Sequence, residues 1–290
     1  MKKLVTAFAT FATIASTSAL AVDLPVKAPP PLLAPAAVYG WTGWYVGLNA
    51  GGGWGRKIDN NLTPGACAIT PSACLAIFAA FNTDIPSQFD TDPRGLIGGG
   101  QVGYSHQLVP NWFAGLEADF QGSNIRGSTG AINTVSGVLP GTSLTTTITS
   151  TASQRLDWFG TFRGRLGWTP ISPLLFYATG GLAYGRVQTA TSFAGQTTDQ
   201  LGPTTFPAGP AASAQSDVRT GWTIGAGLEW MFAPRWSLRA EYLYFDLGSV
   251  TLNTTLIQLA SGVTINGSAN ISSVAHYNGN IVRGGLNYHF

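Results

Sequence analysis

The chain has 290 residues, of which 10% are charged, 11% are aromatic and 37 are glycine. Its net charge is +2, and Lys2 and Lys3 account for this surplus, so that 13 basic and 13 acidic residues balance in the rest of the chain. A balanced chain lacks the broad basic surface that nucleic-acid binding requires, so no nucleic acid is expected as a partner. Few charges and many aromatic residues exclude wholesale disorder. No apolar run after residue 22 reaches the ~20 residues of a membrane helix.

Residues 1–21 have the three parts of a secretory signal peptide. A positive start at Lys2 and Lys3 precedes an apolar stretch over residues 4–14, and Ala19-Leu20-Ala21 is a small-x-small cleavage site. The mature chain is therefore expected to begin at Val22 in an exported compartment. Residues 22–40 are rich in proline and alanine, which predicts an extended periplasmic leader, with a partner-binding tail as the alternative.

From residue 41 onward apolar and polar residues alternate, which indicates β-strands. Eight segments are predicted as strands: 41–55, 95–108, 111–124, 155–169, 173–187, 219–232, 235–248 and 276–290. The connections have 39, 2, 30, 3, 31, 2 and 27 residues, so long and short connections alternate. Residues 41–290 are therefore predicted to form an all-β, eight-stranded antiparallel up-and-down transmembrane β-barrel. It would have four long outer loops, including 125–154, 188–218 and 249–275, and three short periplasmic turns.

The two faces of the strands indicate which side meets lipid. Even-numbered positions are apolar, as in Trp112, Leu116 and Phe120, and the same pattern places Leu156 on the outside. Odd-numbered positions carry small and charged residues. An arginine facing lipid at mid-depth would cost ~2–4 kcal/mol, so the charged face is predicted to line the lumen.

Aromatic residues on the even face fall at two levels, as the two interfaces of a membrane favour. The level near the turns contains Trp44, Trp112, Trp168, Trp230, Trp236 and Tyr288, and the level near the loops contains Trp54, Trp158, Tyr184 and Trp222.

Four acidic and four basic side chains are predicted to face the lumen, which in an eight-stranded barrel is just wide enough for side chains to fill. They are Glu117, Asp119, Glu229, Glu241, Arg163, Arg165, Arg239 and Arg283. Glu229 is expected near Arg239, Glu241 near Arg283, and the two acids of the third strand beside the two arginines of the fourth. Unpaired charges would be costly in a confined lumen, so a structural network of ion pairs is expected. An ion-selective constriction or a gate is the alternative.

Seven further basic residues lie at the strand ends nearest the long loops: Arg56, Lys57, Arg94, Arg126, Arg155, Arg186 and Arg219. This outer basic rim would meet outer-membrane lipids, including the phosphates of lipopolysaccharide. Pairing with nearby aspartates within the protein is an equal alternative.

The remaining candidates for chemistry are two cysteines and three histidines. Cys67 and Cys74 lie in the first long loop of an exported chain, so a disulfide is expected, with metal binding as the alternative. His106, His276 and His289 lie on different parts of the barrel, so no catalytic site, no metal site and no enzyme are predicted. No cofactor is expected, although His276 is a candidate axial ligand for haem in a loop.

The chain ends in alternating apolar residues that include Tyr288 and Phe290. This ending resembles the C-terminal signal that outer-membrane barrels present to the barrel assembly machinery, which is therefore an expected partner.

Several segments also resemble a known family. They are TGWYVGLNAG (42–51), LLFYATGGLAYG (174–185), Arg-x-Glu-Tyr (239–242), the terminal IVRGGLNYHF and the leader VDLPVKAPPP. These segments are similar to the outer-membrane immunogenic and hemin-binding surface proteins of alphaproteobacteria, a porin-labelled family with an OmpA-like barrel. The resemblance implies a barrel in the outer membrane of a Gram-negative bacterium, with periplasmic termini, extracellular loops and a structural role in the envelope. A small channel and a surface binder of haem or host molecules are the alternatives.

Overall fold

The computed structural model describes residues 40–67, 85–139, 142–199, 205–259 and 266–290. The predicted signal peptide (1–21) and all but the last residue of the predicted leader (22–40) lie outside these ranges. In the described part of the chain, no helix has the length and apolar character that a membrane crossing requires.

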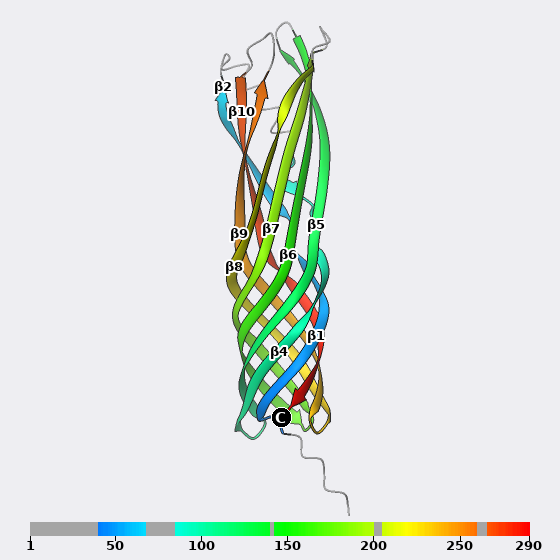
Figure 1. Cartoon of the computed structure of the whole chain (residues 1–290), viewed down its shortest axis with the longest axis vertical. Helices are drawn as coiled ribbons and strands as arrows, with labels where there is room; N and C mark the ends of the chain where they lie inside the picture. Colours follow the sequence, from blue (N-terminus) through cyan, green and yellow to red (C-terminus); the bar gives the residue numbers. More distant parts are fainter. Residues whose placement is uncertain (1–39, 68–84, 140–141, 200–204, 260–265) are drawn as a thin grey trace, which may run out of the picture. The chain divides into compact units, whose positions relative to one another are not determined.

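The described residues form ten strands in one antiparallel sheet (Figure 1). The strands are β1 (Gly43–Gly55), β2 (Ile58–Cys67), β3 (Gln88–Phe89), β4 (Arg94–Val109), β5 (Trp112–Leu139), β6 (Thr142–Ile171), β7 (Leu174–Asp199), β8 (Thr205–Ala233), β9 (Trp236–Leu259) and β10 (Asn266–His289). Pairing of β1 with both β4 and β10 closes β1 and β4 to β10 into an eight-membered ring. The predicted eight-stranded antiparallel barrel is confirmed.

The three short turns join β4 to β5, β6 to β7 and β8 to β9, as the sequence predicts. In the first of them Asn111 has a positive φ of 77°, a conformation that asparagine tolerates better than most residues. The C-terminus lies at the same end of the barrel as these turns (Figure 1).

Most of the described residues of the long connections are in strands, whereas the sequence predicted loops there. β5 and β6 continue as paired strands as far as Leu139 and Thr142, and β7 and β8 are paired as far as Thr198 and Thr205. Threonine and other β-branched residues are frequent in 127–139 and 142–154, and such residues favour extended backbone. A strand crosses a bilayer with 9–11 residues, so strands of 24 to 30 residues continue well beyond the membrane.

Two groups of strands form this continuation, which we call the outer extension (residues 58–67, 88–89, 127–139, 142–154, 188–199, 205–218, 249–259 and 266–276). One group consists of β5 to β8, and the other of β9, β10, β2 and β3. Pairing between β8 and β9 is interrupted from Ala208 to Trp222. Buried apolar side chains from both groups meet, and the rings of Phe89 and Phe193 lie 6.2 Å apart. The extension therefore has an apolar interior of its own.

The side-chain faces follow the predicted parity through the membrane-spanning part, and bulges change it near the extension. The pairing register of β6 shifts between Leu156 and Trp158. As a result Leu156 is buried inside the barrel, with 3% exposed, and the prediction that it faces lipid is wrong. A second register shift lies on β10, between His276 and Asn278. Beyond it, Val250 and Leu252 of the paired strand β9 face inward.

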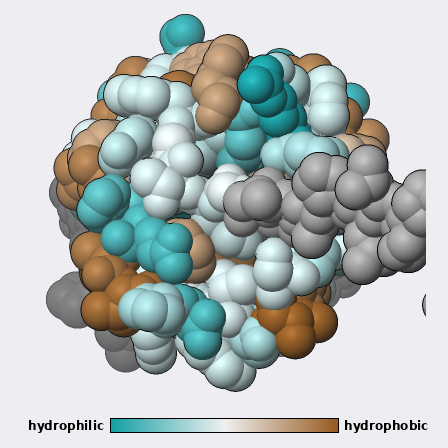
Figure 2. Space-filling view, turned by 90° about the horizontal axis from the view of Figure 1, so that it is seen from below, coloured by the Kyte–Doolittle hydropathy of each residue, from teal (hydrophilic) through white to brown (hydrophobic). Residues whose placement is uncertain are grey.

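An apolar band surrounds the lower part of the barrel. Trp44 and Trp54 on β1 are 59% and 46% exposed, and Trp168 and Trp158 lie at corresponding ends of this band on β6. Each pair is ten residues apart, which at ~3.3 Å per residue and a tilt of ~40° gives about 25 Å, the height of the apolar band of outer-membrane barrels. Seen from the turn end, hydrophobic residues gather mainly at the margin, and more polar residues occupy the middle (Figure 2).

We predict that the outer extension resists hydrogen exchange as a folded sheet does. Amides of Thr147 to Gln154 on β6 and of Gln188 to Phe193 on β7 should exchange at least about 100-fold more slowly than those of Arg56 and Lys57, which lie between strands. Exchange mass spectrometry of the refolded protein measures this. Equal, rapid exchange in both regions would show that the extension is a set of loops.

Candidate functional site in the barrel interior

The eight charged residues predicted to face the lumen all project into it. β5 supplies Glu117 and Asp119, β6 supplies Arg163 and Arg165, β9 supplies Arg239 and Glu241, β8 supplies Glu229, and β10 supplies Arg283. Pairs on one strand are two residues apart, so the strand period places both members on the inner face. These eight residues, here called the charge cluster, are at most 5% exposed in their side chains.

Glu117 lies at the centre of the charge cluster. Arg239 donates two hydrogen bonds to its carboxylate, at 2.5 and 2.9 Å, in the bidentate geometry that makes arginine–carboxylate pairs strong. Arg163 donates a third, and Arg165 lies 3.3 Å away. Tyr45 adds a hydroxyl donor at 2.7 Å. The carboxylate of Glu117 on β5 therefore joins side chains from three other strands, β1, β6 and β9.

The other two central carboxylates share the same arginines. Glu241 accepts hydrogen bonds from Arg163 and Arg239, each at 3.0 Å, and from Nε of Arg283 at 2.7 Å. Asp119 accepts from Arg163 at 2.9 Å and from Arg283 at 2.8 Å. The network closes around the lumen, because each of these arginines contacts at least two acidic side chains.

Glu229 occupies the turn side of the charge cluster. It accepts hydrogen bonds from Arg165 at 2.9 Å, from Ser237 at 2.6 Å and from Asn287 at 2.6 Å. Glu229 and Arg239 are register partners on β8 and β9. The guanidinium of Arg239 nevertheless pairs with Glu117 and Glu241. The other two predicted pairings, Glu241 with Arg283 and the acids of β5 with the arginines of β6, are confirmed.

Two tyrosines belong to the same layer, and sequence reasoning missed both. The guanidinium of Arg165 lies 3.9 Å from the ring centre of Tyr177, a cation–π contact, and Tyr177 donates to Glu241 at 3.1 Å. Each tyrosine lies against a glycine on the next strand: a Cβ at Gly103 would come within 2.3 Å of the Tyr45 ring, and one at Gly227 within 2.5 Å of the Tyr177 hydroxyl. These glycines make room for the rings. The odd numbers of Tyr45 and Tyr177 were the sequence signal that both tyrosines face the lumen.

Apolar layers lie on both sides of the charge cluster. On the turn side, Trp41, Phe113, Leu175 and Met231 pack together, and all are at most 5% exposed. On the outer side, the next inward positions of β9 are Leu243, Phe245 and Leu247, which pack with buried residues of the other strands. Only small and charged residues were expected on the inner face, so the outer apolar layer was not predicted.

This arrangement has a clear electrostatic consequence. Four acids and four arginines compensate one another, and neither apolar layer offers a polar partner to either sign. Removing one member would leave an excess charge in a buried cluster, which is far more costly than the loss of one exposed ion pair. The geometry therefore suits a fixed structural interior.

Some of the seven residues of the outer basic rim form ion pairs with aspartates of the same chain, and others do not. Lys57 pairs with Asp90, Arg94 with Asp92, Arg155 with Asp157 at 2.5 Å, and Arg219 with Asp217 at 3.5 Å. Arg186 donates to the hydroxyl of Ser216 at 3.3 Å. Among the described residues, Arg56 and Arg126 form no ion pair.

The three histidines lie on different parts of the barrel, as expected. His276 lies within β10, 3.4 Å from Asp59. His289 is buried and contacts Ser237 at 2.9 Å, with the ring of Trp41 5.7 Å away. His106 is exposed on the lipid-facing side of β4, as expected.

The cysteines and the C-terminus complete the predicted sites. Cys67 ends β2 and Cys74 lies outside the described residues, so the disulfide stays a prediction. At the C-terminus, the amide of Phe290 donates to the carbonyl of Trp44 at 3.0 Å, and the Phe290 ring lies 5.2 Å from that of Tyr288. Recognition of this ending by the assembly machinery also stays a prediction.

A closed ring of tilted strands, an apolar outer band and a charged interior together define an outer-membrane β-barrel protein. The family model "Outer membrane protein beta-barrel domain" matches residues 9–290. The 31 kDa outer-membrane immunogenic proteins of Brucella melitensis biotype 1 and Brucella suis biovar 1 are each 34% identical over 291 residues, covering 97% of this chain and 98% of each relative. The chain belongs to the outer membrane β-barrel family, its predicted resemblance to outer-membrane immunogenic proteins is confirmed, and its location is the outer membrane of a Gram-negative bacterium.

The chain is also similar to solved structures of low sequence identity. OprG from Pseudomonas aeruginosa is 9% identical with a TM-score of 0.34, covering 87% of this chain and 99% of that chain. Neisserial surface protein A is 12% identical with a TM-score of 0.29, again covering 87% and 99%.

We predict that Arg163→Ala lowers the free energy of unfolding by about 3–5 kcal/mol, because it leaves Glu117, Asp119 and Glu241 with excess buried negative charge. Lys57→Ala, which breaks an exposed pair, is the matched control and should cost less than about 1 kcal/mol. Urea unfolding in lipid vesicles, followed by tryptophan fluorescence, measures both. Equal effects of the two substitutions would contradict a tightly coupled interior.

Proposed function

We propose that this protein is a non-enzymatic, non-conducting barrel with a structural role in the envelope, and that it carries the outer extension at the cell surface. The burial of the charge cluster between two apolar layers is the observation that supports this most strongly. A protein whose interior is fixed in this way acts through its two outer surfaces, the lipid-facing band and the extension.

A conducting pore would need a continuous polar path. Such a path would have to pass Arg163, which contacts acidic side chains on both β5 and β9 and is completely buried. Opening it would separate several charge-assisted hydrogen bonds at once. It would also have to cross the layer formed by Leu243 and Phe245.

The contacts of His289 support a structural role for that residue as well. In a Ser–His–acid catalytic site, the serine and the acid contact different nitrogens of the imidazole ring. Here Ser237 and Glu229 both lie near Nε2, at 2.9 and 3.4 Å. Ser237 also donates to Glu229 itself, and all three residues are buried. Neither the geometry nor the access suits acyl transfer.

The outer extension presents neutral hydroxyl groups to its surroundings. Hydroxyls of Thr134 and Thr147 lie 3.0 Å apart, and those of Thr151 and Ser192 lie 2.7 Å apart, so exposed side chains on neighbouring strands support one another. The Brucella relatives are named as immunogenic. We extend this property to the present chain and assign the extension as the surface that antibodies would reach.

A planar bilayer tests whether the barrel conducts. The mature protein, refolded and inserted, should give no steady current over many insertions verified by recovery of folded protein. A steady, ion-selective current that changes in Arg163→Ala or Glu117→Ala would contradict the proposal and establish a pore.

Loss of the protein from its native host tests the envelope role. Deletion should raise uptake of a hydrophobic fluorescent dye through the outer membrane, and expression of the wild-type chain should restore the barrier. Unchanged dye uptake, together with unchanged sensitivity to detergent, would contradict a structural role.

A further inference from the structure

A row of arginines crosses the outward face of the barrel just above the apolar band. Arg94 on β4, Arg126 on β5 and Arg155 on β6 are consecutive register partners. Neighbouring strands lie ~4.8 Å apart, and like charges directly opposite each other destabilise a sheet. Trp54 is the register partner of Arg94 on the other side, so the row lies at the level of the outer aromatic residues. We call these three arginines the basic row.

Acidic side chains compensate the basic row only in part. Arg94 pairs with Asp92, and Arg155 pairs with Asp157, to which Gln188 also donates at 2.6 Å. Arg126 is exposed and has no acidic partner among the described residues. Arg186, the register partner of Trp158, is a fourth arginine in the same part of the structure, and like Arg126 it has no acidic partner among the described residues. The surplus is positive and is concentrated around Arg126.

Two grooves meet at Arg126, and their chemistry differs. The first has a volume of about 890 Å³ and lies toward the membrane, where Arg94 and Arg126 border the lipid-facing side chains of Trp54, Leu96 and Val282. Gly52, which has no side chain, also lines this groove. An acyl chain fits this apolar lining.

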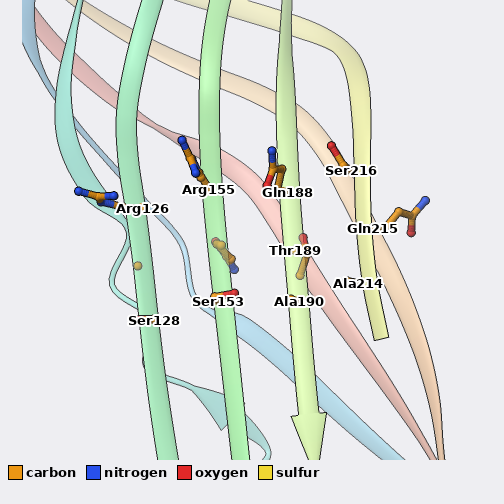
Figure 3. A pocket seen from close by; sticks show the side chains of 12 residues that line it. Arg126, Ser128, Ser153, Arg155, Gln188, Thr189, Ala190, Ala214, Gln215 and Ser216 are labelled. Carbon is orange, nitrogen blue, oxygen red and sulfur yellow. The ribbon is translucent and has the colours of Figure 1, made fainter. Parts of the chain in front are cut away.

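The second groove, of about 610 Å³, lies on the side of Arg126 that faces the outer extension. Figure 3 shows Arg126 and Arg155 next to Gln188 at one end of it, with Ser128, Ser153 and Ala190 toward the other. Hydroxyl, amide and small side chains line this groove, and such groups form hydrogen bonds with sugar hydroxyls. The order along the barrel is therefore apolar groove, arginines, polar groove.

We propose that the basic row binds the phosphate of a phosphorylated glycolipid of the outer leaflet, a lipopolysaccharide. Its acyl chains would lie in the first groove and its sugars in the second. Arginine guanidinium groups match phosphate oxygens in bidentate geometry, and a phosphate dianion among them relieves their mutual repulsion. This binding goes beyond the structural role proposed above, because it would fix the barrel to a particular lipid.

Binding to lipid A tests this proposal. Detergent-solubilised full-length mature protein is titrated with bisphosphorylated lipid A and with dephosphorylated lipid A, and binding is followed by tryptophan fluorescence and native mass spectrometry. The wild-type protein should bind the phosphorylated form at least about tenfold more tightly. Phosphatidylglycerol vesicles identify a site that accepts any lipid phosphate: equal affinity for them would overturn the glycolipid assignment.

Substitutions test whether the basic row is the site that binds the phosphate. Arg126→Gln should weaken binding of phosphorylated lipid A by about tenfold, and the triple variant Arg94→Gln, Arg126→Gln, Arg155→Gln should abolish the preference for phosphate. Arg235→Gln is the control, because it makes the same charge change on an exposed side chain at the turn end; its binding should stay within about twofold of wild type. Heat-modifiable migration on gels verifies that each variant is folded. Wild-type affinity in the folded triple variant would overturn the proposal.

Discussion

A narrow lumen has no room for water around a charge, so every charged side chain inside it must find its counter-ion among the other strands. In this protein Glu117 and Arg163 are completely buried at the centre of such a network. The same requirement explains two glycines. Because Gly103 and Gly227 have no side chains, Tyr45 and Tyr177 have the space to donate hydrogen bonds to the acids. Strand register, ring placement and the balance of charges all serve one compensated cluster.

The two apolar layers give this cluster its character. A salt-bridge network in contact with water exchanges partners easily and contributes little to stability. Between Trp41 on the turn side and Phe245 on the outer side, the same groups have as partners one another and a few buried polar side chains such as Tyr45, which makes rearrangement costly. The outside of the barrel is thus apolar where it meets lipid. Along the barrel axis, the lumen has an apolar layer, then the charge cluster, then a second apolar layer. Above the membrane the same strands continue into the two groups of the outer extension, so the barrel and the surface structure are one folded unit.

Much of this architecture was predictable from the sequence, because strand alternation and turn length are local signals. The alternation placed Glu117, Arg163 and Glu241 on one face, and the structure brings them together. Strand order was enough to predict that Glu241 pairs with Arg283 and that the acids of β5 pair with the arginines of β6. The partner of Arg239 was not predictable in this way, because Arg239 reaches across the lumen to Glu117 although Glu229 is its register partner. Ion pairing there depends on the lumen's width and on side-chain length, which no local pattern encodes.

The bulges and the length of the strands were also not predictable from the sequence. One extra residue near Leu156 reverses the side-chain parity, and nothing in the alternation itself marks that point. The serine- and threonine-rich segments were interpreted as loops because they lack large apolar residues, yet their hydroxyl and β-branched side chains suit strands that pair in water. Leu243 and Phe245 were visible as odd-numbered apolar residues, and counting them as inward would have revealed the outer apolar layer.

A crystal structure that resolves ordered water tests the central claim most directly. The account predicts no continuous file of water molecules between the layer that contains Trp41 and the layer that contains Phe245, and direct contacts between Arg163 and its three acidic partners. A continuous chain of water past Arg163, with those contacts replaced by water-mediated ones, would contradict a closed interior.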